Sequence, residues 1–281
     1  MTRPRIFLLT TLAMIAFAGN SLLCRAALKD ASIDPASFTT IRLVSGALTL
    51  WLLVRAAGGS ADGRGSWPSA MALFVYAFFF SLAYGGLSAA TGALILFASV
   101  QATMIAYGLR AGERFSAWQL AGLCTAAAGL VVLLIPGLTA PPVARALLMM
   151  GAGVAWGVYS LRGRAAGNPT RVTAGNFLRA ALIAVAASIV AGKGAFLTAS
   201  GVGLAVASGA LASGMGYALW YAVLPALRAT RAAVVQLSVP AIAAVGGALL
   251  LREPITLRVL LASAAIIGGI ALVVLERRKP A

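Results

Sequence analysis

Long apolar runs alternate with short polar breaks along the whole chain. Ten runs are close to the length of about 20 residues that a helix needs to cross a bilayer. They are Ile6–Cys24, Pro35–Val54, Pro68–Tyr84, Ser88–Tyr107, Ala117–Ile135, Val143–Leu161, Val172–Ala191, Gly201–Leu224, Ala232–Leu251 and Leu257–Leu275. Only Gly85-Gly86-Leu87 separates the third run from the fourth, so nine spans is the alternative to ten. The pattern predicts an all-α integral membrane protein.

Composition supports this interpretation. Of 281 residues, 61% are hydrophobic and 10% are charged, and the mean hydropathy is +0.97. A soluble domain is closer to half apolar and a quarter charged. The net charge of +16 could indicate a nucleic-acid partner, but the basic residues lie mainly in the breaks between runs, as in polytopic membrane proteins. We therefore expect the lipid bilayer as a partner, and no nucleic acid. Cys24 and Cys124 fall within apolar runs, which argues against a disulfide framework.

The distribution of Lys and Arg predicts the orientation. With the N-terminus inside, the inner breaks hold 14 basic residues and the outer breaks hold 5, while Arg25, Arg42 and Arg179 lie within runs. Because Lys and Arg in short loops fix topology, both termini should be cytoplasmic. Merging the third and fourth runs would reverse every later break and remove the asymmetry, which favours ten spans.

The second half of the chain repeats the class pattern of the first half. A shift of 140 residues places Glu113 on Glu253, Ser116 on Thr256 and Gly129 on Gly269. Each half, 1–138 and 139–281, then holds five spans. Because five is odd, the second half must cross the membrane upside down relative to the first. The sequence thus predicts ten transmembrane helices in two inverted five-helix repeats, an architecture typical of alternating-access carriers.

Several motifs carry a resemblance to a known family. The turns GERFS (Gly112–Ser116) and REPIT (Arg252–Thr256) are each followed by a helix rich in small residues, and the run Gly216–Tyr221 leads through Arg228 to Arg231. In these features the chain resembles the ten-span EamA-type exporters of the drug/metabolite transporter superfamily, over nearly its whole length. The resemblance implies an exporter of amino acids or other small metabolites in the cell inner membrane.

The family usually carries a proline in both the fourth and the ninth spans. Pro240 supplies the ninth and is the expected hinge, whereas Val100 stands at the matching place in the fourth. A proline inside a helix leaves a carbonyl without its partner, here that of Gln236. In lipid such a carbonyl must be satisfied by protein, water or ligand. We therefore expect this region to face a central cavity.

Polar and aromatic side chains at membrane depth are the candidate cavity residues. Polar groups are costly in lipid unless they face protein or a wet cavity, so each is either interhelical hydrogen bonding or cavity lining. Aromatic side chains at helical spacing are often packing or interface anchors instead. The expected substrate-cavity set is Phe17, Asn20, Arg42, Tyr76, Phe80, Gln101, Trp156, Tyr159, Asn176, Tyr217, Trp220 and Gln236.

The charged candidates divide into one binding and two structural hypotheses. Arg42 lies inside its run, where it either snorkels to the interface or binds a substrate carboxylate. Glu113 and Glu253 each precede a plausible helix N-cap, Ser116 or Thr256, so we expect both acids to be structural. Ser116 followed three residues later by Gln119 is the pattern of a capping box.

A carrier is the function that fits this inventory. Histidine is absent and no Asp or Glu lies mid-span, which removes the common metal sites and proton relays of an intramembrane enzyme. No charge ring or repeated filter loop suggests a channel. We expect a carrier of amino acids or similar small molecules, without catalytic residues, metal or cofactor, and with no required oligomer. Nucleotide sugars or drugs are the alternative substrates, and an enzyme is a remote alternative.

Overall fold

The computed structural model describes residues 2–59, 65–112, 115–135, 137, 140–163, 168–191, 196–227 and 235–275, and these are almost entirely helical. Within these ranges the only β-structure is an isolated antiparallel bridge between Ile33 and Leu197. The helices are α1 (Arg3–Lys29), α2 (Pro35–Ala56), α3 (Trp67–Tyr84), α4 (Ala89–Arg110), α5 (Ala117–Leu134), α6 (Val143–Gly163), α7 (Pro169–Ala191), α8 (Ala199–Ala207), η1 (Ser208–Met215), α9 (Gly216–Val223), η2 (Leu224–Ala226), α11 (Ser238–Leu251) and α12 (Leu257–Leu275).

The predicted spans are present as helices. Nine helical segments in the described part of the chain are long and apolar enough to cross a membrane, with Ala199–Ala226 counted as one. The tenth, α11, has 14 described residues, and residues 228–234 before it lie outside the described ranges. α3 and α4 are separate helices, because Ser88 caps α4 by accepting a hydrogen bond from the Thr91 N–H. The prediction of an all-α, multi-pass membrane protein is confirmed.

Two predicted helix caps are present, and two other predicted features lie outside the described residues. Ser116 and Gln119 form the expected reciprocal capping box at the start of α5. Thr256 accepts a hydrogen bond from the Val259 N–H at the start of α12. Glu113, the acid of the first turn, lies outside the described residues, as do positions 138 and 139 at the predicted boundary between repeats.

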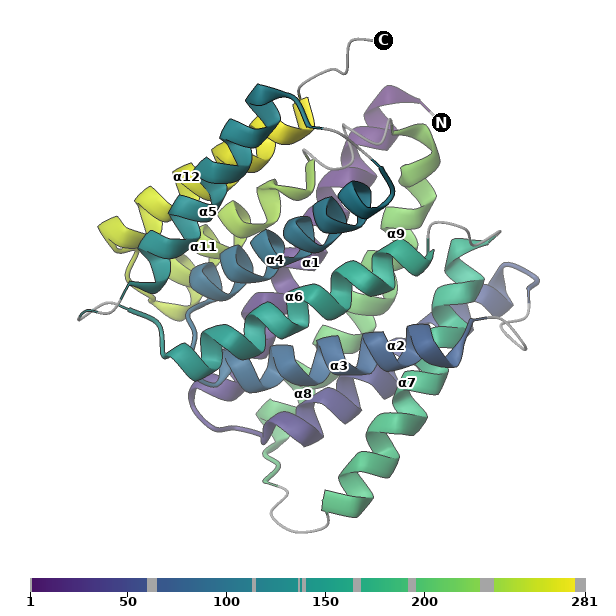
Figure 1. The fold of residues 1–281 in the computed structure, drawn as a ribbon. Helices are drawn as coiled ribbons and strands as arrows, with labels where there is room; N and C mark the ends of the chain where they lie inside the picture. Colours follow the sequence, from purple (N-terminus) through teal and green to yellow (C-terminus); the bar gives the residue numbers. More distant parts are fainter. Residues whose placement is uncertain are drawn as a thin grey trace.

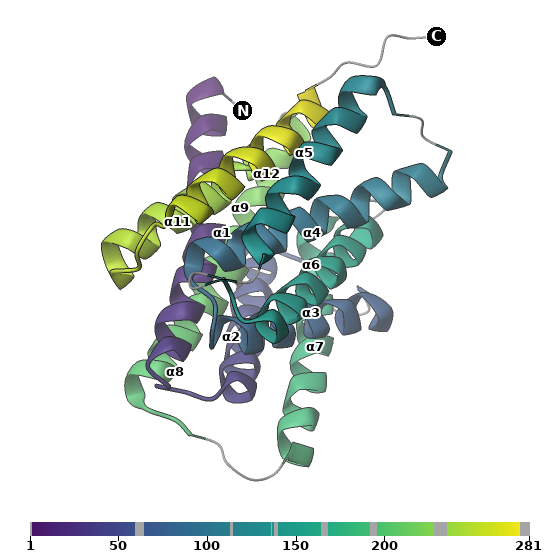
Figure 2. The same ribbon diagram turned by 60° about the vertical axis from the view of Figure 1, so that its left-hand side comes forward.

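The helices pack in pairs drawn from opposite halves of the chain. α5 lies along α12, α2 lies along α7, and α4 lies against α11. α6 contacts both α3 and α4. α1 contacts both the α8–α9 segment and α11. α5 and α12 run side by side in both views of the molecule (Figures 1 and 2). α1 begins and α12 ends at the same end of the molecule (Figures 1 and 2).

Small residues let these helices approach closely. A Cβ at Gly122 of α5 would lie 2.6 Å from the Gly269 carbonyl oxygen of α12, and a Cβ at Gly269 would clash in turn with the Gly122 carbonyl. Gly153 and Gly157 form a GxxxG motif on α6 that faces α4. A Cβ at Gly153 would lie 2.7 Å from the Leu96 carbonyl oxygen, and one at Gly157 would lie 2.8 Å from Thr103 Cβ. Close backbone contact of this kind drives helix association in lipid.

The eighth span contains a π-helix that the apolar pattern does not predict. The run Gly201–Leu224 was expected as one regular helix, but η1 replaces eight of its residues with π-helical turns. In a π-helix, hydrogen bonds join residues five apart, so residues five apart lie over one another. Gly209 and Gly214 have this spacing, and a Cβ on either would collide with α2. The π-helix therefore presents a flat, small-residue face on which α2 packs.

The ninth span is broken at Leu237 and does not run as one continuous helix. Residues 235 and 236 are helical, Leu237 is a turn, and α11 starts at Ser238, which makes Pro240 its third residue. Proline is tolerated in the first turn of a helix, where its missing N–H costs nothing. α4 continues without a break through Val100. The two matching spans therefore differ, as the single proline implies.

Candidate functional site

A cavity of about 680 Å³ lies among α1, α3, α4, α6, η1 and α9. It is lined by Phe17, Asn20, Ser21, Tyr76, Phe80, Leu96, Phe97, Val100, Gln101, Met104, Trp156, Ser160, Gly163, Pro169, Ala212, Ser213, Tyr217, Trp220, Tyr221, Leu224, Leu227 and Gln236. Gly163 is the last residue of α6, Pro169 is the first of α7, and Leu227 follows η2. The cavity thus runs from the middle of the helices to one of their ends, called here the open end.

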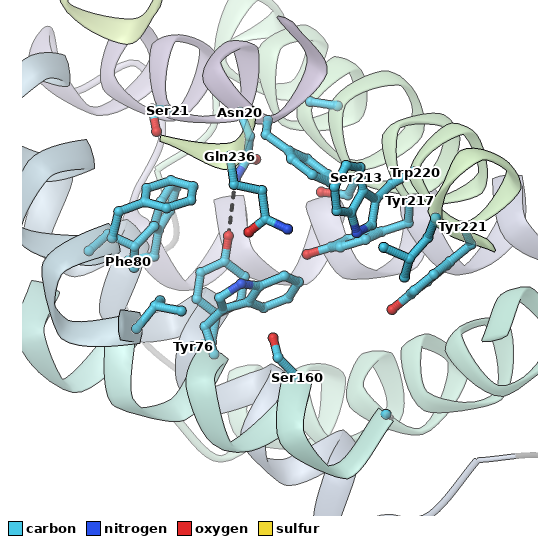
Figure 3. A pocket seen from close by; sticks show the side chains of 18 of the residues that line it. Asn20, Ser21, Tyr76, Phe80, Ser160, Ser213, Tyr217, Trp220, Tyr221 and Gln236 are labelled. Atoms are coloured by element: carbon cyan, nitrogen blue, oxygen red, sulfur yellow. Dashed lines mark hydrogen bonds between the residues drawn. The ribbon is translucent and has the colours of Figure 1, made fainter. Parts of the chain in front are cut away.

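Nine of the twelve predicted residues line this cavity. They are Phe17, Asn20, Tyr76, Phe80, Gln101, Trp156, Tyr217, Trp220 and Gln236. In the close view, Gln236 and Tyr217 point their polar ends toward the middle of the cavity, and Ser160 points toward them from the opposite wall (Figure 3). Their contact with a substrate stays a prediction.

Aromatic rings make up much of the wall. The ring of Trp156 lies 4.9 Å from that of Tyr76 and 5.3 Å from that of Tyr217, measured between centroids. Phe17 contacts Tyr217 and Trp220 with centroids 5.6 and 6.1 Å apart. These tilted contacts, drawn from four helices, hold the rings as one packed surface. Only a few polar groups interrupt that surface, as in most small-molecule sites.

Arg42 lies behind the wall and does not line the cavity, contrary to its predicted place. Its side chain is fully buried, and it donates hydrogen bonds from Nη2 to the Tyr76 hydroxyl at 3.0 Å and from Nε to Ser213 Oγ at 3.3 Å. The guanidinium carbon lies 5.2 and 5.0 Å from the ring centroids of Tyr76 and Phe80. Snorkelling to the interface, the other hypothesis for this residue, does not describe a side chain held in this way.

Tyr159 and Asn176 also lie away from the cavity, although both are buried. The Asn176 amide donates to the Tyr159 hydroxyl at 3.5 Å, and its oxygen accepts from the Ser66 N–H at 2.9 Å. Ser66 is the N-cap of α3. These two predicted residues join α6 and α7 to the start of α3, which is the interhelical hydrogen bonding that was their alternative role.

Four polar residues of the cavity wall were not in the predicted set. Ser21, Ser160, Ser213 and Tyr221 line the cavity. Serine is common in helix interfaces of membrane proteins, so its presence in a span gives no signal of a cavity. Tyr221 lies four residues after Tyr217, on the same face of α9, and that spacing is the signal that could have placed it.

The opposite end of the cavity is closed by a buried ion pair between α1 and the turn after α11. Arg25 Nε donates to Glu253 Oε1 at 2.7 Å, and the side chains are 15% and 8% exposed. The other oxygen of Glu253 accepts from the Ala89 N–H at the start of α4 at 2.8 Å, and Arg25 Nη1 donates to the Tyr84 carbonyl at 3.0 Å. The ion pair thus ties together α1, α3, α4 and the end of α11. We call this the closed end.

Sequence reasoning predicted a structural role for Glu253 but did not identify its partner. Arg25 and Glu253 are 228 positions apart, and the pair is the only ion pair within the described ranges. Arg252, directly before the acid, has a left-handed backbone with φ of 54°. This uncommon conformation ends α11 and turns the chain so that Glu253 reaches back to α1.

Tyr84 fills the space between the closed end and the cavity. Its side chain is fully buried, its ring lies 4.7 Å from that of Phe80, and a Cβ at Gly92 would overlap it. Phe80 lines the deep wall of the cavity. A continuous stack of packed rings therefore separates the cavity from the closed end.

Asp34 holds a second, more exposed junction near the closed end. Its carboxylate caps α2 by accepting from the Ala36 and Ser37 N–H groups, and it accepts from the Phe196 N–H before α8 at 3.2 Å. Partial burial would raise the pKa of Asp34, but the hydrogen bonds from Ser37, Phe196 and Ala36 outweigh it and lower the pKa.

The side chains of the cavity wall can bind a small molecule. No group of three or more metal-ligating side chains occurs among the residues described, and both cysteines are free. The cavity wall offers amides, hydroxyls and aromatic faces, which can orient a ligand through hydrogen bonds and apolar contact.

Comparison with known proteins assigns the chain to a family. The sequence profile of the EamA-like transporter family matches residues 144–275, within the second predicted repeat. A Pseudomonas aeruginosa protein named "Uncharacterized protein PA1977" is 54% identical over 280 residues, covering 99% of this chain and 97% of its own length. A solved structure titled "Crystal structure of protein" has the same fold, with a TM-score of 0.70, 22% identity and coverage of 96% of each chain. This chain belongs to the EamA-like transporter family of the drug/metabolite transporter superfamily.

Proposed function

We propose that the protein is a secondary carrier that exports amino acids or similar small metabolites by alternating access. One observation carries the proposal: the cavity reaches the helix ends at one side of the molecule, while the Arg25–Glu253 pair and Tyr84 seal the other side. A carrier requires a central site that is open to one side at a time. A channel would require a continuous path, and the packed rings interrupt it.

Two inverted repeats, 1–138 and 139–281, are part of this proposal. If α1 to α5 correspond to α6, α7, α8–η2, α11 and α12, the packing partners map onto one another. α3 against α6 then corresponds to α8–α9 against α1, and α4 against α6 corresponds to α11 against α1. The equivalent pairs α2 with α7 and α5 with α12 pack directly. This reciprocity supports a pseudo-two-fold relation between the halves, about which a carrier can rock.

We further propose that the protein lies in the cell inner membrane with both termini cytoplasmic. The excess of Lys and Arg in the predicted inner breaks supports this orientation, and so does the location of the start of α1 and the end of α12 at one end. The open end of the cavity then faces the cytoplasm, from which an exporter takes its substrate. One chain encloses the whole cavity, so no oligomer is needed for binding.

The cavity wall supports a small substrate with both polar and apolar parts. A volume of about 680 Å³ is within the usual range of small-molecule sites, and the wall combines aromatic rings with the amides of Asn20, Gln101 and Gln236. Such a surface suits amino acids with apolar side chains. Nucleotide sugars and drugs are the alternative substrate classes for the same fold.

The test is transport by the purified protein in liposomes, with a panel of labelled amino acids. We expect saturable uptake of at least one apolar amino acid down its gradient. Ser160→Phe should reduce this flux at least tenfold, because the new ring occupies the cavity. Val158→Phe places the same ring two residues earlier on α6, on a side chain that is 40% exposed, and should transport normally.

Two results would contradict the proposal. One is the absence of flux for every member of the panel while nucleotide sugars or drugs are transported, which would replace the substrate class. The other is equal flux in the Ser160→Phe and wild-type proteins, which would remove this cavity from the transport path. Thermal melting of each variant shows whether a lost flux reflects unfolding.

A further inference from the structure

Arg42 is a buried cation that has no acidic partner among the residues that the structure describes. The described carboxylates are Asp30, Asp34 and Glu253, and among them only Glu253 forms an ion pair, with Arg25. The guanidinium of Arg42 is held by two hydrogen bonds and two aromatic faces, and its Nη1 is buried with no hydrogen-bond partner in the described part of the chain. A buried donor without a partner is costly, and a buried charge is costlier still.

The hydrogen bonds around Tyr76 have a definite direction. Its hydroxyl oxygen accepts from Arg42 Nη2 at 3.0 Å. It also accepts from Asn20 Nδ2 at 3.3 Å (Figure 3). A tyrosine hydroxyl has two acceptor sites and one donor proton. Since both acceptor sites are filled, the hydroxyl can form a further hydrogen bond only as a donor. The Tyr76 side chain borders the cavity.

The hydrogen bonds of Asn20 and Ser213 run in the same direction as those of Tyr76. The oxygen of Asn20 accepts from Ser208 Oγ at 2.7 Å, and the amide nitrogen donates to Tyr76. Ser213 Oγ accepts from Arg42 Nε, so its own proton also remains to be donated. Ser208 and Ser213 reach this cluster together because they are five residues apart in the π-helix η1.

We propose that this cluster is the site for an anionic group of the substrate, such as a carboxylate. Tyr76 and Ser213 donate to it directly at the deep wall of the cavity, and Arg42 supplies the compensating positive charge from behind them. The inference rests on the carrier proposed above and deepens it by assigning one end of its substrate. Charge-assisted hydrogen bonds from a buried cation favour a carboxylate over a neutral carbonyl or a hydroxyl.

A structural role alone accounts for less of the geometry. Contact with the faces of Tyr76 and Phe80 stabilises a guanidinium, but it does not require an unpartnered amino group or hydroxyls turned to donate. At the closed end, where the role is structural, the arginine has its own carboxylate. None of the described acids pairs with Arg42 in this way, which leaves room for an anion from the substrate.

Binding is tested with three probes that share one branched carbon chain. L-leucine has a carboxylate and an amine, isovalerate has only the carboxylate, and isoamylamine has only the amine. Trp156 and Trp220 line the cavity, so their fluorescence in the purified protein reports occupancy. We expect L-leucine and isovalerate to bind, and isoamylamine to bind at least tenfold more weakly. Preference for the amine, or no binding of either carboxylate, would overturn the inference.

Three variants locate the effect. Arg42→Met should abolish isovalerate binding. Tyr76→Phe keeps the ring and removes only the hydroxyl, and should weaken isovalerate binding at least tenfold even if Arg42→Met fails to fold. Tyr107→Phe removes a hydroxyl outside the cavity, from a side chain that is 56% exposed, and should have no effect. Unchanged affinity in Tyr76→Phe would exclude the site.

The same proteins separate this inference from the proposed function. If wild-type protein transports L-leucine and Tyr76→Phe binds isovalerate equally well, the carrier stands and the anion site falls. If the variants lose isovalerate binding but no amino acid is transported by the wild type, the anion site stands and the assigned transport falls.

Discussion

Arg25 and Arg42 are two arginines on neighbouring helices within the same apolar protein, and they are satisfied in different ways. At the closed end, Arg25 meets Glu253, and that acid also binds the start of α4. Beside the cavity, Arg42 meets only hydroxyls and aromatic rings. The first cation is neutralised within the fold, so the ion pair can hold the closed end together. The second has no neutralising acid within the described ranges, so its charge remains available to a ligand that enters the cavity. The presence of a carboxylate partner, more than the depth of the charge, distinguishes the structural role of Arg25 from the proposed binding role of Arg42.

The largest effect should come from removing the acid of the closed end. Glu253→Ala leaves Arg25 without its acidic partner, and breaking one half of a largely buried pair costs up to about 3–5 kcal/mol. We expect a clear drop in the melting temperature of the detergent-solubilised protein. The double variant Arg25→Met/Glu253→Leu should recover most of the loss, because apolar side chains can replace a buried pair. Lys29→Met, which loses an exposed hydrogen bond to the Leu251 carbonyl, should change stability little.

The same substitution should open the closed end. Leu87, between α3 and α4, is 1% exposed, so a cysteine placed there is shielded. In a chain with Cys24 and Cys124 changed to alanine, a membrane-impermeant thiol reagent added to intact cells should label Leu87→Cys only when Glu253 is also replaced. Labelling only from the cytoplasmic side would reverse the proposed orientation, and equal labelling with and without Glu253 would show that the pair does not close this end.

A smaller effect should follow from giving Arg42 a carboxylate of its own. Ser213→Asp places an acid where the hydroxyl now accepts from Arg42 Nε. The resulting charge-assisted bond should raise the free energy of unfolding, on the order of 1 kcal/mol, and isovalerate should no longer bind. Ser213→Asn has nearly the same shape without the charge and should retain isovalerate binding at reduced affinity. If Ser213→Asp bound isovalerate as the wild type does, Arg42 would not be the source of the attraction.

The smallest effect concerns an acid held by neutral donors alone. Asp34→Ala should cost about 0.5–2 kcal/mol, the usual value of a lost helix cap, whereas Asp34→Asn keeps a capping oxygen. Because hydrogen bonds lower the folded-state pKa of Asp34, its charge stabilises the fold above the ordinary aspartate pKa, and this contribution is lost as the pH falls through the lowered value. The difference in melting temperature between wild type and Asp34→Asn should shrink from about pH 6 to about pH 3. A constant difference would show that the charge contributes nothing.

The sequence predicts the elements of this fold well, because lipid imposes simple rules on it. A chain that must satisfy its backbone within each span gives apolar runs of the length observed, and polar breaks mark their ends. Local signals such as the Ser116–Gln119 capping box also depend only on neighbours in the chain, and that prediction is confirmed.

Features that depend on packing between distant helices could not be predicted in this way. In the sequence, nothing distinguishes Arg25 from the other arginines within spans. Its role depends on the left-handed turn at Arg252, which brings Glu253 to it. Arg42 could be identified as a candidate from its depth, but its place behind Tyr76 depends on how α2 packs on η1. Tyr159 and Asn176 are polar residues at membrane depth, as the cavity residues are. Only their hydrogen bonds to each other, and that of Asn176 to Ser66, distinguish them.

The π-helix also determines how the chain can change in length. Ser208 and Ser213 would lie about 140° apart around a regular α-helix, because five residues exceed one turn of 3.6. Deleting one residue between them would leave four residues of spacing and an ordinary α-helix, with both serines again on one face. The residues beyond the deletion would keep their direction, because an α-helical turn would replace the wider π-helical turn. Tyr217 and Trp220 would then still line the cavity wall. A deletion in α8 or α9, which are already α-helical, would instead rotate the residues beyond it by about 100°. The π-helix is therefore the part of this span that can lose one residue without turning the cavity wall.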